Sequence, residues 1–292
     1  MRTLVPVLLL CSTLAGQEPV QGAESKPAAG TPAERYRALL DEYKLTGGGG
    51  AMTDAERVQS IGRGYQRHSE LASKLVELAA ANPDDPIALE ALIQAVWQVN
   101  TTPWPVQVVG TDPARARAFE LLQRDHLRSE KLDALCQRVS FGYCREYEPF
   151  LRAVLAASPH RAVAAQACVG LARLLTNRMG RLVQLADAPA AAREFAELFG
   201  AEYLAELQRK PASDVRAEAA ALFERAATEF GDQTYSGELK VTDVARAGAF
   251  ELEHLQIGCT APPTEGRDQH GEHFSLADYR GKVVLLDFWH WH

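Results

Sequence analysis

Apolar residues recur at helical spacing through most of the chain, from Thr53 to about Leu255. In the first stretch they stand three or four positions apart, which places them on one face of a helix. Thr53 and Glu56 precede them with the spacing of a capping box, a signal of a helix start. The pattern predicts a long amphipathic helix, ending before Asn82, that buries Val58, Ile61, Tyr65, Leu71, Leu75 and Leu78.

A second helix is predicted immediately afterwards, with Asp85 as its N-cap and Pro86 at its first position. The two helices form a predicted hairpin. The same order of helix, short break and helix returns around Pro159, and its first half returns before Gly231. We therefore predict an all-helical domain over 53–255, built either as stacked repeats in the tetratricopeptide style or as an irregular bundle.

Few residues of this helical region suggest a catalytic or metal-binding site. His68, His126 and His160 are scattered, without the spacing of a metal site. The carboxylates are distributed over polar helix faces, as solubility alone requires. We accordingly name no catalytic, cofactor-binding or metal-binding residue and expect no cofactor.

The pattern changes at Ile257, where prolines, glycine-flanked turns and short β-like stretches replace helical spacing. Gly271 marks a predicted hairpin turn between "PTEGRD" and "EHFSL", and Ser275 caps a predicted helical turn. The apolar run from Val283 to Phe288 then predicts a central strand covered on both faces.

This C-terminal stretch resembles the start of the thioredoxin-like redoxin family, in particular exported thiol-disulfide oxidoreductases of the TlpA-like and AhpC/TSA type. The matching residues are Ile257, Gly258, Ala261, Pro262, Gly271, Phe274, Leu276 and the run "DYRGKVVLLDFW" from Asp278 to Trp289. The resemblance implies that 256–292 is the incomplete beginning of an α/β thioredoxin-like domain.

In that family a Cys-x-x-Cys pair follows the strand, and its first thiolate attacks a disulfide. The sequence ends at His292, where the resemblance places the next residue as the first cysteine. Cys259 lies in a segment without a catalytic role in the family, so we do not assign it as a nucleophile. The sequence is then a truncated record, from a frameshift or fragmentary gene, or it stops at a selenocysteine codon.

The N-terminal residues predict export. A positive charge at Arg2, an apolar stretch from Leu4 to Leu14 and small residues near Ala15 indicate a signal peptide over 1–16. The stretch is too short to span a bilayer, which needs about 20 apolar residues. Because of this signal peptide, we expect a periplasmic or extracellular protein. Residues 17–52 are predicted to be a flexible spacer with one short helix and a glycine loop.

Charge and cysteine content further limit the possible partners and the possible disulfides. The 292 residues carry a formal charge of −7 without basic runs, which argues against nucleic acid as a partner. Of the cysteines beyond the leader, Cys136 and Cys144 are the best candidates for a disulfide, but free thiols are the stronger interpretation, since a large domain does not need a disulfide. Cys168 has the pattern of a small core residue. A metal site at His290 and His292 has too few ligands to be favoured.

Two functions remain open. In the first, the protein is an exported thioredoxin-like oxidoreductase whose partners are protein thiols or disulfides, but whose catalytic cysteines are absent from this sequence. In the second, it is a non-catalytic secreted helical-repeat protein that binds a protein partner.

Overall fold

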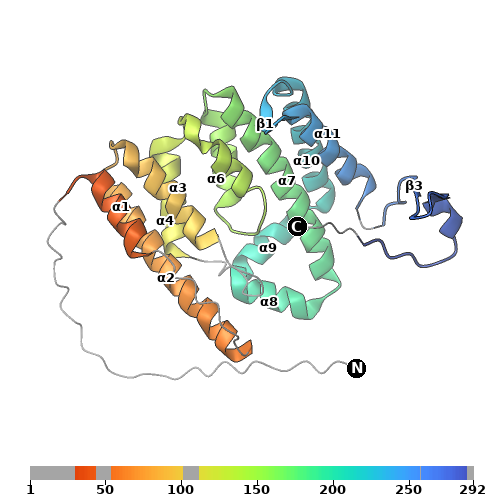
Figure 1. Ribbon diagram of the computed structural model, residues 1–292, viewed down its shortest axis with the longest axis horizontal. Helices are drawn as coiled ribbons and strands as arrows, with labels where there is room; N and C mark the ends of the chain where they lie inside the picture. The colour runs from red at the N-terminus through yellow and green to blue at the C-terminus, as the bar shows by residue number, and fades with distance from the viewer. Residues whose placement is uncertain (1–29, 44–53, 101–111, 257, 288–292) are drawn as a thin grey trace.

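The computed structural model describes residues 30–43, 54–100, 112–256 and 258–287. Over these ranges the chain is mainly helical, as its apolar periodicity predicts (Figure 1). The α-helices are α1 (Pro32–Glu42), α2 (Asp54–Ala81), α3 (Pro86–Asn100), α4 (Pro113–Leu121), α5 (Asp133–Arg138), α6 (Tyr147–Ala157), α7 (Arg161–Ala186), α8 (Pro189–Phe199), α9 (Ala201–Arg209), α10 (Ala212–Glu229) and α11 (Val241–His254). Shorter elements are η1 (Leu122–His126), η2 (Glu130–Leu132), η3 (Leu276–Tyr279), β1 (Thr234–Ser236), β2 (Leu239–Lys240), β3 (Glu265–Arg267) and β4 (His273–Ser275).

The predicted hairpin of α2 and α3 is present. Asp85 caps α3, because its Oδ1 accepts a hydrogen bond of 2.9 Å from the backbone N–H of Ile87. Pro86 occupies the first helical position, where its missing N–H costs no hydrogen bond. Thr53, the first residue of the predicted capping box of α2, lies outside the described residues.

The short helix predicted within the spacer is α1, and it is joined to the helical body. Its N-cap Thr31 and Glu34 exchange hydrogen bonds as a capping box. Partly buried apolar residues of this segment, among them Tyr36, Leu39 and Leu40, pack against the core that includes α2 and α3. The part of 17–52 that the structure describes therefore contributes to the core.

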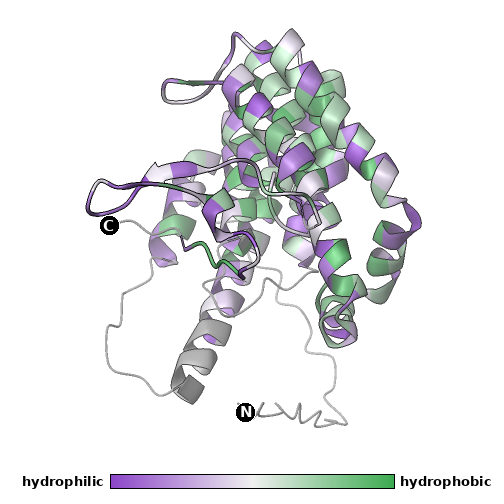
Figure 2. Ribbon diagram, turned by 90° about the vertical axis from the view of Figure 1, so that its right-hand side faces the viewer, coloured by the Kyte–Doolittle hydropathy of each residue, from purple (hydrophilic) through white to green (hydrophobic). Residues whose placement is uncertain are grey.

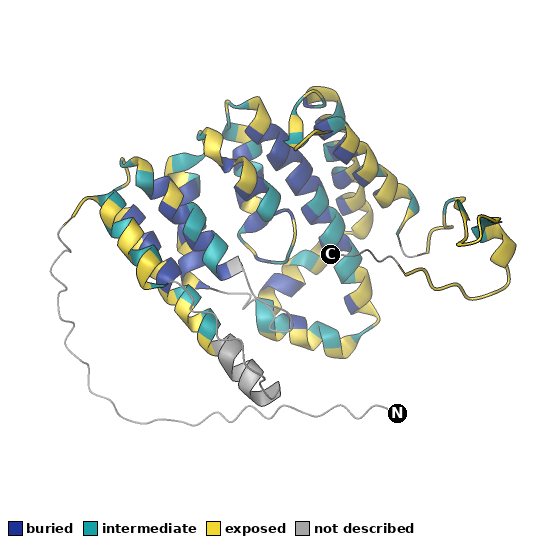
Figure 3. Ribbon diagram, in the orientation of Figure 1, coloured by how far each residue is buried: buried dark blue, intermediate teal, exposed yellow. Residues whose placement is uncertain are grey.

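The long helix α7 runs through the middle of the molecule and contacts α5, α6, α10 and α11 (Figures 1 and 3). Small residues allow these close approaches. A β-carbon at Gly170 would lie 2.9 Å from the carbonyl oxygen of Cys136 in α5 and 3.3 Å from Leu151 Cδ2 in α6. Hydrophobic residues are concentrated between the helices of this body (Figure 2).

The candidate disulfide between Cys136 and Cys144 is not formed, because both cysteines are free. Cys136 lies fully buried in α5, and Cys144 is buried before α6. Each thiol fills its own place in the core, so neither needs a partner sulfur. Cys168, predicted to be a small core residue, is buried in α7, where its thiol contacts the carbonyl oxygen of Leu222 at 3.3 Å.

A two-stranded hairpin interrupts the region predicted to be all-helical. Strands β1 and β2 pair antiparallel, with Gly237 at φ 56° in the turn between them. This turn needs a left-handed backbone, which glycine adopts without steric cost. The hairpin is short enough that helical periodicity on either side hides it.

The C-terminal segment carries the predicted hairpin and helical turn. Strands β3 and β4 pair antiparallel, and Gly271 has φ 83° in the connecting turn. Ser275 caps η3, and the backbone N–H of Ser275 donates a hydrogen bond to the side chain of Asp278. No residue between 258 and 287 is buried, so this segment adds nothing to the helical core (Figure 3).

The predicted strand from Val283 to Phe288 is wrong over the part that the structure describes. Residues 283–287 have no secondary structure, and the side chains of Val283 and Leu285 are almost fully exposed. A strand needs a neighbour for its backbone N–H and C=O groups. Within the described residues β3 and β4 pair only with each other, so the apolar run finds no sheet.

Further predictions fall on residues that the structure does not describe. These are the signal peptide over 1–16, the glycine loop of the spacer, and the pair His290 and His292. Among the described helices, none combines the length and the apolarity that crossing a membrane requires.

Candidate functional site

The residues that the structure describes hold no assembled catalytic or metal centre. No three His, Cys, Asp or Glu side chains among them converge as a metal site would require. His160 Nε2 contacts the carbonyl oxygen of Arg128 at 3.0 Å, and His68 Nδ1 contacts Gln98 Oε1 at 2.5 Å. Both histidines thus have structural partners.

Of the described thiols, Cys136, Cys144 and Cys168 are buried and therefore poor nucleophiles, whereas Cys259 is exposed. Burial raises the pKa of Cys136 and Cys144 above the ordinary thiol range, and it raises the pKa of Cys168 to about 11. Cys259 is exposed and free, and its thiol contacts the carbonyl oxygen of Glu253 at 3.5 Å. We find no thiolate centre in this part of the chain.

A pocket of about 340 Å³ lies between α6, α7, α9 and the start of α10. Its size falls within the range of pockets that bind small ligands. Apolar and charged side chains line it together. They are Arg145, Glu148, Pro149, Arg152, Leu175, Arg178, Met179, Leu182, Tyr203, Glu206, Leu207, Lys210 and Val215.

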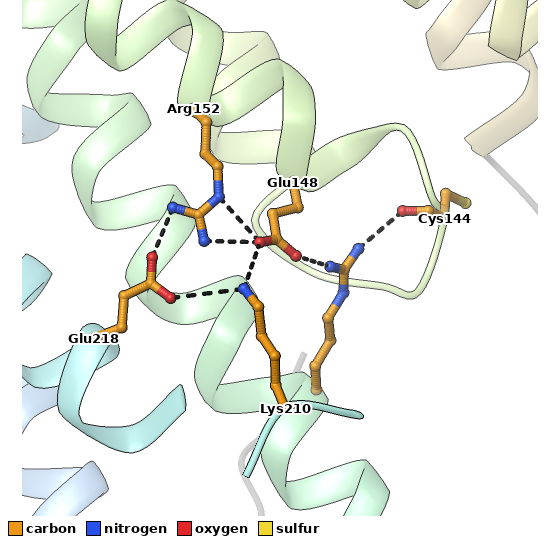
Figure 4. A network of polar contacts seen from close by, with 6 residues as sticks. Cys144, Glu148, Arg152, Lys210 and Glu218 are labelled. Atoms are coloured by element: carbon orange, nitrogen blue, oxygen red, sulfur yellow. Dashed lines mark hydrogen bonds and ion pairs between the residues drawn. The ribbon is translucent and has the colours of Figure 1, made fainter. Parts of the chain in front are cut away.

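Glu148, from the first turn of α6, is the centre of the charged side of the pocket (Figure 4). Its Oε2 lies 2.6 Å from Arg178 Nη1, and its Oε1 lies 2.7 Å from Arg152 Nη2 and 3.7 Å from Lys210 Nζ. Arg152 also contacts Glu218 Oε1 of α10 at 2.6 Å. The network therefore joins α6, α7, α10 and the residue that follows α9.

The positive charges of this network lower the pKa of Glu148. Burial alone raises the pKa of Glu148, but the hydrogen bond from Arg152 and the positive charges of Arg178, Arg152 and Lys210 outweigh it. The net result is a pKa below the ordinary glutamate range. Glu148 is thus held as a carboxylate.

Arg178 is a buried cation at the inner end of the pocket. Its side chain is 4% exposed, and Nη2 donates a hydrogen bond of 3.0 Å to the carbonyl oxygen of Cys144. Its Nε has no hydrogen-bond partner among the described residues. One donor of this buried guanidinium is therefore unpaired in the described structure.

Tyr203, from α9, is the second group with spare hydrogen-bonding capacity. It is 5% exposed, lines the pocket, and its hydroxyl has no hydrogen-bond partner in the described structure. The guanidinium groups of Arg178 and Arg145 lie 5.6 Å and 5.9 Å from its ring centroid. Burial raises the pKa of Tyr203, so the hydroxyl remains protonated and can donate.

Two further hollows of about 320 Å³ and 130 Å³ extend the pocket along α7. Met179 lines all three cavities, and Leu182, Lys210 and Val215 are common to the pocket and the larger hollow. We call the three cavities together the α7–α10 groove. Its floor is the C-terminal half of α7, and its opposite wall is the chain from α9 into α10.

This site was not predicted from the sequence, from which no site residue was named. One signal was present: Leu171, Leu175, Arg178 and Leu182 follow one another at helical spacing, so Arg178 lies on the apolar stripe of its helix. A charge in such a position needs a partner when the stripe is buried. The pattern does not say which residue provides it.

Comparison with known proteins gives no relative: no protein-family model, no curated protein and no solved structure matches the chain. The candidate site therefore rests on its own geometry.

Proposed function

We propose that the helical body is a non-catalytic binding module that holds an acidic, partly apolar peptide segment of a partner protein in the α7–α10 groove. The observation that carries the proposal is the groove itself, in which an apolar floor meets a positively charged end. Apolar groups would bind Met179, Leu182 and Val183, of which Val183 is 41% exposed. Acidic groups would bind the cationic side chains.

The charge of the groove differs in sign from that of the whole protein. The chain carries a formal charge of −7. At the charged end of the groove four cations face three carboxylates, a local excess of one positive charge; these residues are Arg145, Arg152, Arg178, Lys210, Glu148, Glu206 and Glu218. This local excess favours an acidic segment over a basic one, because charge complementarity selects partners and orients them.

The proposal is tested with a random peptide library displayed on phage and selected against the full chain. We expect enrichment of peptides that combine carboxylates with large apolar residues. Val183→Glu should weaken the selected peptides about tenfold or more, since it adds a negative charge and removes an apolar contact. Leu239→Glu is the matched control, because Leu239 is similarly exposed but lies on β2, away from the groove.

Two results would count against a partner segment. Selected peptides that bind the Val183→Glu and Leu239→Glu variants equally well would place their site elsewhere. A gain in peptide affinity on Leu285→Asp would show that the exposed apolar run of this chain competes for the groove, making it an internal docking site.

A second candidate function is the exported thiol-disulfide oxidoreductase that the redoxin resemblance implies. It is favoured by β3 and β4 with their turn at Gly271 and by the Ser275-capped turn, which occur where the resemblance expects them. In this proposal the helical body precedes a thioredoxin-like domain whose cysteine pair follows His292. The described thiols offer no substitute for that pair.

The nucleotide sequence downstream of the His292 codon tests this second candidate. A reading frame that continues with a Cys-x-x-Cys motif, or with UGA in place of the first cysteine codon, would support it. The 292-residue chain itself should not reduce insulin disulfides above a cysteine-free variant. Reductase activity that disappears on Cys136→Ser or Cys144→Ser would instead place an active site in the helical body.

A further inference from the structure

We propose that the inner end of the α7–α10 groove is a site for a single carboxylate attached to an apolar body, with the Tyr203 hydroxyl and the Arg178 guanidinium as its donors. This inference rests on the proposed binding function and specifies the chemical group that the groove recognises. Three features of the described residues carry it.

The first feature is the hydroxyl of Tyr203. Buried polar groups in folded proteins almost always have a hydrogen-bond partner. This hydroxyl is buried on a residue that is 5% exposed, it belongs to the lining of the pocket, and it has no partner in the described structure. An acceptor oxygen that reaches this hydroxyl from the pocket would receive its hydrogen bond.

The second feature is the charge around that hydroxyl. Arg178 has one donor, Nε, without a partner among the described residues, while its other nitrogens hold Glu148 and Cys144. Lys210 and Arg145 have side chains that are 57% and 60% exposed, so both can reorient toward a ligand. With an excess of one positive charge, this end of the groove fits a monoanion such as a carboxylate better than a dianion such as a phosphate monoester.

The third feature is the apolar remainder of the pocket. Beside the charged network, side chains from several helices and the Pro149 ring present carbon atoms to the cavity; they are Pro149, Leu175, Met179, Leu182, Leu207 and Val215. A ligand with an apolar chain next to its carboxylate would bury that chain here, and the contact adds affinity in proportion to the area removed from water.

A structural role alone does not account for Tyr203. A tyrosine hydroxyl kept for folding has a partner, as Tyr65 has in Asp112 at 2.9 Å and Tyr235 has in Arg173 at 2.7 Å. Removing an unpartnered buried hydroxyl costs no stability, whereas removing a partnered one does. Tyr203→Phe thus separates ligand binding from folding.

Two kinds of ligand carry a carboxylate next to an apolar body: a free carboxylic acid and the C-terminus of a peptide. Isothermal titration of the full chain with octanoate and with N-acetyl-alanyl-leucine distinguishes them. The C-terminal amide of the same dipeptide and octanamide serve as neutral matched ligands. We expect at least one carboxylate to bind and its amide to bind about tenfold or more weakly, since the amide lacks the charge that Arg178 recognises.

Tyr203→Phe should weaken carboxylate binding about threefold to tenfold while leaving the unfolding midpoint in urea unchanged or higher. Tyr65→Phe is the control, and it should lower the unfolding midpoint without changing carboxylate affinity. The site is overturned if amides bind as well as carboxylates, if neither carboxylate binds, or if Tyr203→Phe has no effect on binding.

These outcomes are separate from those of the proposed function. Phage-selected peptides that depend on Val183 but bind equally to the Tyr203→Phe variant would leave the binding module in place and remove the carboxylate site. Carboxylate binding that depends on Tyr203, together with peptides indifferent to Val183→Glu, would support a small-ligand site and remove the peptide groove.

Discussion

Gly248 of α11 lies directly against the aromatic ring of Phe223 in α10. A β-carbon at Gly248 would overlap the Cε1 and Cζ atoms of that ring, and Phe223 is 1% exposed. The contact holds α11 close to α10, the helix that forms one wall of the α7–α10 groove. A side chain as small as a methyl group would force the two helices apart or push Phe223 from its place.

Gly248→Ala should therefore destabilise the protein by about 1–3 kcal/mol, the usual cost of overpacking a core. Urea denaturation followed by circular dichroism measures the change. Gly180→Ala in α7 is the matched control, because a β-carbon at Gly180 would meet open space, with no neighbouring atom within 4 Å. That control should gain up to about 1 kcal/mol from the higher helix propensity of alanine. Equal effects of the two substitutions would contradict the close contact.

The ion pair between Glu148 and Arg178 predicts a second stability difference. Glu148→Gln leaves the buried Arg178 with a weaker, uncharged acceptor, and a hydrogen bond to a charged group contributes about 1.5–3 kcal/mol. Glu206→Gln is the control, since its pair with Arg145 is largely exposed and contributes about 1 kcal/mol or less. Denaturant midpoints that fall equally in both variants would show that the inner pair has no special role.

The lowered pKa of Glu148 predicts how stability depends on pH. Its stabilising contribution is fully present above the ordinary glutamate pKa of about 4.3 and is lost as the pH falls through the lower pKa of the folded state. The free energy of unfolding of the native chain should therefore decrease below about pH 4.3 more steeply than that of Glu148→Gln. Urea titrations between neutral and acid pH measure both slopes, and parallel curves would exclude the linkage.

The thiols predict a clear order of reactivity. Cys259 is exposed, whereas Cys136, Cys144 and Cys168 are buried with raised pKa values. A thiol reagent such as dithionitrobenzoate should modify Cys259 in the native protein and the three buried thiols only after unfolding. Cys259→Ser should remove one fast-reacting thiol. Fast reaction of a buried cysteine in the native state would indicate an open helical core.

The apolar run before the end of the described chain predicts self-association. Val283 and Leu285 are almost fully exposed, next to Val284 and Leu286, which are about half exposed. Contiguous exposed apolar side chains favour association. Leu285→Asp should lower light scattering at high protein concentration, whereas Leu239→Asp, at an isolated apolar position, should change it little.

The sequence by itself determined the elements that depend on neighbouring residues. Asp85 and Pro86 start α3, Gly271 turns β3 into β4, and Ser275 caps η3. Each signal acts over a few positions of backbone, so its outcome hardly depends on the remainder of the chain. The mainly helical class followed from apolar spacing for the same reason.

Tertiary structure decided everything that depends on which elements meet. Cys136 and Cys144 are near in sequence, but the helices around them bury each thiol separately. The run beginning at Val283 has the composition of a buried strand, yet a strand forms only beside another strand, and the short strands of the described chain pair only as β1 with β2 and β3 with β4.

The candidate site also depends on which helices meet. Glu148, Arg178, Tyr203 and Lys210 come from separate stretches of the chain, and they meet because α6, α7, α9 and α10 pack together. Helical periodicity places Arg178 on a buried stripe, but it does not select the partner across the interface, since many pairings of amphipathic helices bury similar areas. Only the packed helices bring Glu148, the cations that contact it and the unpartnered hydroxyl of Tyr203 around a single pocket.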